Sequence, residues 1–358
     1  MHNPDITSEI PQAGTPAPGP VPPDLSADLP TGLPSPLSTD VSAGEVLAPY
    51  LHARAADFLR GLRLHTESGA DTKGAAEAAR ILRAAARRIS GTLHTFRPLL
   101  DAAWADPLRT ELAWLSGTLA LEHACTSRLV RLMDALSRLS SGTGPVPAAR
   151  GAQGAGLTVG AARAGALLDR QLTLARTRAH SAALQALGSS RFHAVADAVA
   201  LLASEVPLGP AGSARAVDTL DAPAQDVEHR LLDAVAALPL TRAAHPYNAE
   251  ALALATGEAQ DTPWHHTRRL LRLHRYAAEV LHGAAAADPV LYEAARALDR
   301  HRDAAEAAAA AATAARTPRI APATAYALGV LHADQRHDVE AARFAFQRAW
   351  SQATAAVP

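Results

Sequence analysis

Apolar residues recur along most of the chain at spacings of three and four positions, which is the period of an amphipathic α-helix. The pattern starts at about residue 44, where Val46, Leu47, Tyr50 and Leu51 open the first run. No stretch shows the strict two-residue alternation that is typical of a half-buried strand. The periodic runs predict helices over residues 45–65, 71–96, 105–139, 158–187, 191–205, 214–238, 263–283, 288–316 and 322–354.

The segments between these runs are short and contain proline, glycine and serine, as at 140–156 and 206–213. Such residues end helices and form turns. Long helices joined by short breaks predict an all-α fold of antiparallel helical bundles. The composition agrees, because alanine is abundant and aromatic residues make up only 4% of the chain.

Residues 1–43 differ from the rest. They hold ten of the 25 prolines and five acidic residues, but no lysine or arginine. A segment of this kind cannot bury a core, so we expect a disordered N-terminal tail. It shows no basic region followed by an apolar one, as a secretory signal would. We therefore expect a soluble, cytoplasmic protein, in which the single cysteine, Cys125, is a small buried helix residue and not a nucleophile.

The net charge of −1 hides an uneven distribution. Without the tail, 34 basic residues face 30 acidic ones, an excess of four positive charges. Lys73 is the only lysine, so nearly every cation is a guanidinium group. This planar group matches the geometry of phosphate and carboxylate.

Basic residues form a stripe on two of the predicted helices. They recur at offsets of zero, three and seven positions, which at 3.6 residues per turn fall on one narrow face. The positions are Arg80, Arg83 and Arg87 in one helix, and His265, Arg268 and Arg272, extended by Arg275, in the other. The two copies lie 185 residues apart. This separation predicts a duplicated bundle, with a first repeat at 44–205 and a second at 206–357.

The second stripe carries few acids of its own, since Glu279 is the only one within 264–281. Like charges three or four positions apart destabilise a helix by about 0.2–0.5 kcal/mol per pair. An anion that binds the stripe would relieve this repulsion. The alternative is a solvated face whose arginines pair with acids on neighbouring helices.

Three segments resemble the CHAD family, the conserved histidine α-helical domain. "HHTRRLLRLHRYAAE" at 265–279 resembles its His-x-x-Arg-x-x-x-Arg/Lys-x-x-Arg signature. "ARRISGTLHTFRPLLD" at 86–101 resembles its "TRRLRSALRTFRPLLD", and "LDRHRDA" at 298–304 resembles its "LGDHQDA". The similarity extends over about 44–357 and includes the last predicted helix.

The resemblance implies two helical-bundle repeats that bind inorganic polyphosphate and associate with polyphosphate-containing granules. It also implies the residues that would bind the polyanion. They are Arg80, Arg83, Arg87 and Arg88 in the first repeat, and His265, Arg268, Arg269, Arg272, Arg275 and His301 in the second.

The first repeat departs from the family pattern. Arg80 stands where the family has its histidine, and Ser90 stands at a position that is usually basic. In the second repeat, Leu273 replaces a residue that is usually basic. Arg80 keeps the positive charge, so anion binding is compatible with this change. A role that needs histidine is not.

These departures leave a second hypothesis open: a helical scaffold or regulator that binds a protein partner or nucleic acid and has lost polyphosphate binding. We expect neither catalysis nor a cofactor. No H-x-x-x-H occurs, and E-x-x-H occurs once, at Glu279–His282, which is too little for a metal-binding bundle.

Overall fold

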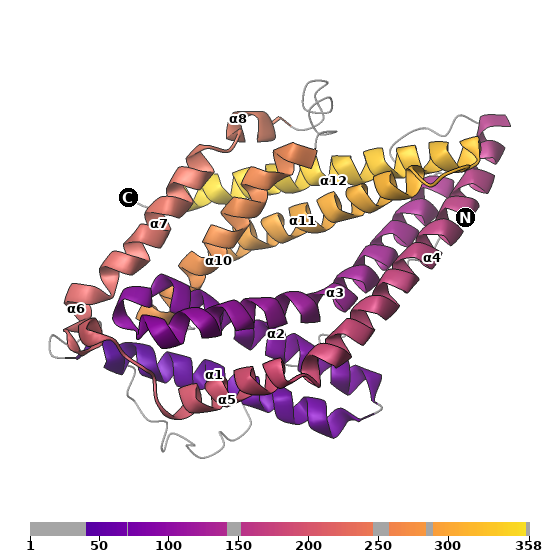
Figure 1. The fold of residues 1–358 in the computed structure, drawn as a ribbon. Coiled ribbons are helices and arrows are strands. Elements are labelled where there is room, and N and C mark those ends of the chain that lie inside the picture. Colours follow the sequence, from indigo (N-terminus) through magenta and orange to yellow (C-terminus); the bar gives the residue numbers. More distant parts are fainter. Residues whose placement is uncertain (1–40, 70, 142–151, 246–257, 284–288, 356–358) are drawn as a thin grey trace, which may run out of the picture. The chain divides into compact units, whose positions relative to one another are not determined.

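The computed structural model describes residues 41–69, 71–141, 152–245, 258–283 and 289–355, and helices dominate all of these ranges (Figure 1). No strand occurs within them, only isolated bridges between Ser42 and Arg215 and between Leu100 and Leu208. The all-α prediction is therefore confirmed. Residues 1–40 of the predicted tail and 142–151 of the predicted loop lie outside the described ranges. The remaining residues of that loop, 140–141 and 152–156, are helical, so the loop prediction was wrong at both ends.

The α-helices are α1 (Ala43–Ser68), α2 (Thr72–Thr95), α3 (Ala102–Ser141), α4 (Ala152–Leu187), α5 (Ser190–Ser204), α6 (Ala216–Thr219), α7 (Asp221–Ala236), α8 (Leu240–Ala243), α10 (Thr262–His282), α11 (Pro289–Ala315) and α12 (Pro322–Ala355). Three short 3₁₀ turns accompany them: η1 (Arg97–Leu99), η2 (Pro210–Ser213) and η3 (Glu258–Asp261). The helix predicted over 214–238 is thus two consecutive helices, α6 and α7.

Local capping explains where the first two helices begin. At α1, the Ser42 hydroxyl accepts from the Glu45 amide at 3.3 Å, and the Glu45 carboxylate accepts from the Ser42 amide at 2.8 Å. At α2, the predicted cap Asp71 accepts from the amides of Lys73 and Gly74, both at 3.0 Å. Such a cap stabilises a helix by about 1 kcal/mol.

Three large clusters of buried apolar side chains hold the helices together. The first joins α1, α2, α3, α5 and α6 with the start of α7 and the end of α10. The second joins α7, α10, α11 and α12. The third joins α3 and α4 with α11 and α12. Two of these clusters contain residues from both sides of position 205, and the repeat boundary there stays a prediction.

Helix α10 belongs to two clusters at once. Ala277 and Val280 near its end pack into the first, whereas Trp264, Leu270 and Leu271 pack into the second. The basic residues of α10 belong to neither cluster. The apolar pattern of α10 therefore fixes the direction in which its basic residues project.

A buried ion network anchors the beginning of α10. Asp261, just before this helix, accepts from Arg336 at 2.7 Å and from Arg343 at 2.8 Å, both on α12. Arg343 also pairs with Glu340 at 2.7 Å and donates to His301 Nε2 at 3.3 Å. Burial alone would raise the pKa of Asp261, but neighbouring His301 and the hydrogen bond from Arg336 hold it well below its ordinary value. Removing one member would leave a buried charge unpaired, which typically costs about 3–5 kcal/mol.

Candidate functional site

Helices α2 and α10 carry the two basic stripes and pack against each other (Figure 1). Gly91 makes this close approach possible. A Cβ atom at position 91 would lie 2.7 Å from Cδ2 of the Tyr276 ring and 3.3 Å from Leu273. The missing side chain thus brings the first stripe close to the second.

A pocket of about 610 Å³ opens between α2, α3 and α10. This volume lies within the range of small-molecule binding sites. Four arginines and a histidine line the pocket, and none of its lining residues is acidic. The lining consists of Arg87, Ser90, Gly91, His94, Arg109, Thr110, Ala113, Ser116, Gly117, Arg269, Arg272, Leu273 and Tyr276.

Arg87 and Arg272 are the two arginines of the pocket that are both buried in part and without an ion pair. Neither forms an ion pair with any described residue, and Arg87 Nε is buried without a hydrogen-bond partner. Burial, together with the positive charges of Arg268 and Arg87, lowers the pKa of Arg272 to about 10. Burial also lowers the pKa of Arg87. The fold therefore holds two partly desolvated cations together without a direct ion-pair partner among the described residues, and only the more distant charge of Asp299 opposes theirs.

Further cations continue from this pair toward α11. Burial and the charges of Arg87 and Arg302 lower the pKa of Arg83. Arg302 is paired with Asp303, and Arg268 donates to Asp299 at 2.6 Å. Positive charge therefore continues beyond the pocket, and acids of α11 compensate part of it.

His265 lies at the same edge. Burial lowers its pKa, and the charges of Arg268 and Arg302 contribute to this effect. The residue is exposed in part, while its ring makes an edge contact with the buried ring of His301, with 5.4 Å between their centroids. The neutral form of His265 is thus favoured beside these charged residues.

A family model described as "CHAD domain" matches residues 53–312, which is more than half of the chain. The chain belongs to the CHAD family. Among solved structures, PptA from Streptomyces chartreusis is 60% identical to this CHAD protein, with a TM-score of 0.73. The match covers 87% of this chain and 100% of that one. No curated protein matches the chain. Family membership suggests a polyphosphate-related function.

Of the ten residues predicted as polyphosphate ligands, Arg87, Arg269 and Arg272 line the pocket, and Arg83, Arg268 and His265 lie around the charge cluster next to it. The remaining four, Arg80, Arg88, Arg275 and His301, do not line it.

Arg80 is exposed and ion-paired with Glu77 one turn earlier on the same helix. Arg88 is turned toward α1 and α10, where it donates to Glu279 at 3.1 Å. Arg275 lies over the Tyr292 ring of α11, 5.7 Å from its centre. These three arginines thus have partners within the fold.

His301 is only 1% exposed. Its ring stacks on Trp264, and burial lowers its pKa to about 4 against the opposing effect of Asp261. This side chain belongs to the ion network that anchors α10.

Three basic residues of this region were missed from the sequence. His94 follows Arg87 by seven positions and so continues the stripe of α2. Continuing the basic stripe of this helix by two turns beyond Arg87 would have identified His94. Arg109 of α3 and Arg302 of α11 come from helices without a stripe, and only the packing of the helices brings them near.

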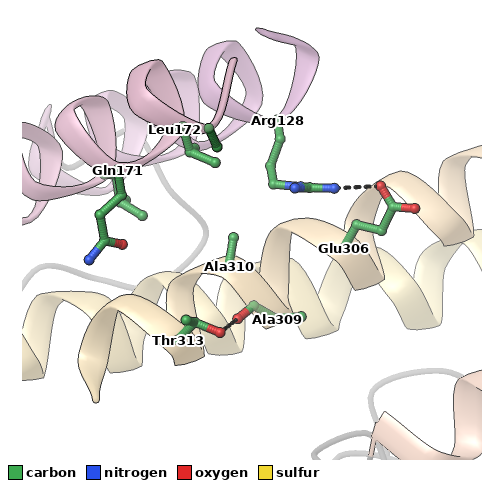
Figure 2. A pocket seen from close by; sticks show the side chains of 9 residues that line it. Arg128, Gln171, Leu172, Glu306, Ala309, Ala310 and Thr313 are labelled. Atoms are coloured by element: carbon green, nitrogen blue, oxygen red, sulfur yellow. Dashed lines mark hydrogen bonds and ion pairs between the residues drawn. The ribbon is translucent and has the colours of Figure 1, made fainter. Parts of the chain in front are cut away.

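A second pocket, of about 400 Å³, lies between α3, α4 and α11 (Figure 2). Leu168, Leu172, Ala309 and Ala310 make its lining mainly apolar. Its single cation, Arg128, points toward Glu306 and pairs with it at 2.7 Å, as Figure 2 shows. Nothing in this pocket attracts a polyanion.

Among the described residues, no group of three or more histidine, cysteine, aspartate or glutamate side chains is placed to hold a metal ion. Within the same ranges, none of the helices combines the length and the apolar character needed to cross a bilayer. The predicted role of Cys125 as a buried helix residue is confirmed, since it lies buried in α3.

Proposed function

We propose that this CHAD protein binds inorganic polyphosphate in the pocket between α2, α3 and α10, without chemical turnover. The observation that carries the proposal is the pair Arg87 and Arg272, two half-buried cations that form no ion pair with any described residue and whose charge Asp299 offsets only in part. A bound phosphate chain would supply the missing negative charge. Phosphate oxygens accept two parallel hydrogen bonds from one guanidinium group, which suits both side chains.

A phosphate chain fits this site better than a single phosphate ion. The positive charge runs from Arg109 and Arg269 in the pocket through Arg272 and Arg87 to Arg83 at its edge. One ion could satisfy only a part of this line. Successive units of a chain would reach several arginines at once, and linked contacts strengthen one another through their high effective concentration.

The test is a titration of the full chain with long-chain polyphosphate at low and at moderate salt. We expect binding that weakens steeply with salt, because ions are released from the polyanion as they are from nucleic acids. The double variant R87M/R272M should lose at least about tenfold in affinity, since a charge-assisted hydrogen bond contributes about 1.5–3 kcal/mol. Unchanged affinity in this variant would contradict the proposal.

A matched control is R60M. Arg60 is exposed on α1 and pairs with Asp57, away from the pocket lining. It removes one arginine from the same protein without touching the site, so its affinity should stay near that of the wild type. An equal loss in R60M would show that polyphosphate responds to net charge and not to the pocket.

Two further measurements separate the alternatives. DNA of matched charge is added as a competitor, and displacement of polyphosphate by DNA would favour a nucleic-acid-binding protein. Phosphate release is followed with Mg²⁺ present, and release by the wild type would show turnover. Association with polyphosphate granules follows from the proposed binding and should be lost in R87M/R272M.

A further inference from the structure

His94 lies in the last turn of α2, at one end of the pocket, and is surrounded by charged groups from three other helices. Arg109 and Asp106 face it from α3, Arg269 from α10 and Arg230 from α7. Three of these four neighbours are cations. Burial and the charges of Arg109 and Arg269 therefore lower the pKa of His94, against the smaller opposing effect of Asp106.

The hydrogen bond between His94 and Arg109 defines the protonation state of the His94 ring. Arg109 Nη1 lies 3.3 Å from His94 Nδ1. A guanidinium group can only donate, so Nδ1 must be the acceptor and the ring proton must sit on Nε2. His94 is thus neutral in this arrangement, and it cannot take up a second proton while Arg109 occupies Nδ1.

Arg109 is not held firmly by other partners. Its contact with Asp106 is long, at 3.6 Å, because Asp106 makes its shorter contact, at 2.8 Å, with Arg97. Arg109 Nε is buried and has no hydrogen-bond partner among the described residues. An anion entering the pocket therefore competes for Arg109 only with a weak ion pair and the His94 ring.

We infer that His94 and Arg109 form a proton-coupled subsite for one phosphate group of the bound chain. The phosphate draws the Arg109 guanidinium away from His94 and takes its hydrogen bonds. Nδ1 is then free and accepts one proton from the solvent. The resulting imidazolium donates to the phosphate, so that one proton is taken up for each chain that fills the subsite. This inference rests on the proposed function.

The position of His94 on α2 favours this step. The carbonyl groups at the end of a helix carry partial negative charge, which stabilises a nearby cation. The three surrounding arginines oppose protonation of His94, whereas a phosphate group would offset their charges. Histidine titrates in the range where such a change of neighbours shifts its charge.

The experiment measures the affinity of the full chain for long-chain polyphosphate between about pH 5.5 and 8, the range in which histidine titrates. We compare the wild type with H94Q, which stays neutral, and H94R, which stays charged. The affinity of the wild type should rise relative to H94Q by up to about tenfold as the pH falls through this range. The affinity of H94R relative to H94Q should show no such dependence. Protonation of the polyphosphate ends affects all three proteins alike and cancels in these ratios.

His265 is the second histidine near the bound chain, and H265Q is the matched control. H265Q should retain the pH dependence of the wild type. If the dependence disappears in H265Q and persists in H94Q, the proton binds elsewhere and the inference is overturned. Parallel curves for the wild type and H94Q overturn it as well.

A measurement on the wild type alone removes any effect of altered folding in the variants. Calorimetric titrations in buffers of different ionisation enthalpy report the number of protons taken up on binding. We expect a value approaching one near the pH at which the wild type and H94Q diverge most. Binding without proton uptake would overturn the inference and leave the proposed function intact, whereas no binding at any pH would overturn the proposed function itself.

Discussion

Replacing Arg272 by methionine should make the protein more stable and weaken its binding of polyphosphate. Methionine is long and apolar, so it keeps most of the packing of the arginine stem and removes the charge. Arg272 is partly buried beside Leu273 and Tyr276 in the pocket lining, and it has no ion-pair partner among the described residues. The variant therefore removes an unfavourable charge without leaving an unpaired acid behind.

The magnitude follows from the pKa. Burial and neighbouring arginines lower the pKa of Arg272 from its ordinary value to about 10. A depression of roughly two pKa units or more corresponds to about 3 kcal/mol of destabilisation of the charged form. At neutral pH the side chain is charged in both the folded and the unfolded state, so this penalty is fully present. It would diminish only as the pH rose above about 10. Solvent at the open side of the pocket reduces the effect, and we expect a gain of about 1–3 kcal/mol.

The assay is urea unfolding of wild type and R272M, followed by circular dichroism at low salt. The midpoint should move to higher urea with an unchanged slope, which indicates a change in stability alone. Added salt should stabilise the wild type more than the variant, because it screens the arginine cluster. R80M is the control: Arg80 is exposed and paired with Glu77, so its stability should change little. A destabilised R272M, or one that binds polyphosphate as tightly as the wild type, would refute the reasoning.

Three other changes have defined signs. D299N removes the carboxylate that pairs with Arg268 at 2.6 Å and should raise the affinity for polyphosphate roughly two- to fivefold in a calorimetric titration; a loss of affinity would mean that Asp299 orients Arg268 for the ligand. G91A places a Cβ atom 2.7 Å from the Tyr276 ring and should lower the free energy of unfolding, because overpacking costs about 1–3 kcal/mol against about 1 kcal/mol gained from the helix propensity of alanine. His301 is buried with a pKa of about 4, below that of an unfolded chain, so the stability that its neutral form provides is complete above about pH 6.5 and is lost as the pH falls toward 4. In H301Q the unfolding midpoint should depend less on pH over this range than in the wild type. An unchanged pH dependence would assign the acid sensitivity to other groups.

The helices were predictable because local patterns determine them. Each of the nine ranges predicted from apolar periodicity contains a helix in the structure, and Asp71 was recognised as a cap from its residue type alone. The break between α6 and α7 was missed. Leu220, at the junction, keeps helical backbone angles, so neither its residue type nor the apolar pattern marks the interruption.

The candidate site was predictable only in part, since a stripe gives the direction of side chains on one helix but not the groups that face them. Arg87 and Arg272 were found because both lie on stripes. Arg88 is adjacent to Arg87 in sequence, yet it pairs with Glu279, which lies 191 positions away. Arg109 joins the pocket from a helix with no basic periodicity. Such pairings depend on which helices pack together, and that information is not local.

The contrast between two pairs of arginines explains why the pocket is the place where an anion should bind. Arg336 and Arg343 are nearly fully buried on α12, and Asp261 meets both of them, so their charges serve the fold. Arg87 and Arg272 are also withdrawn from water, but neither forms an ion pair with a described residue, and the charge of Asp299 offsets only part of their desolvation. A fold that supplies counter-charges in its interior could have supplied one here, at a gain in stability. Without an ion pair, the two arginines lower the stability of the fold but stay available to a polyanion. Such a loss of stability is expected where the same residues serve binding.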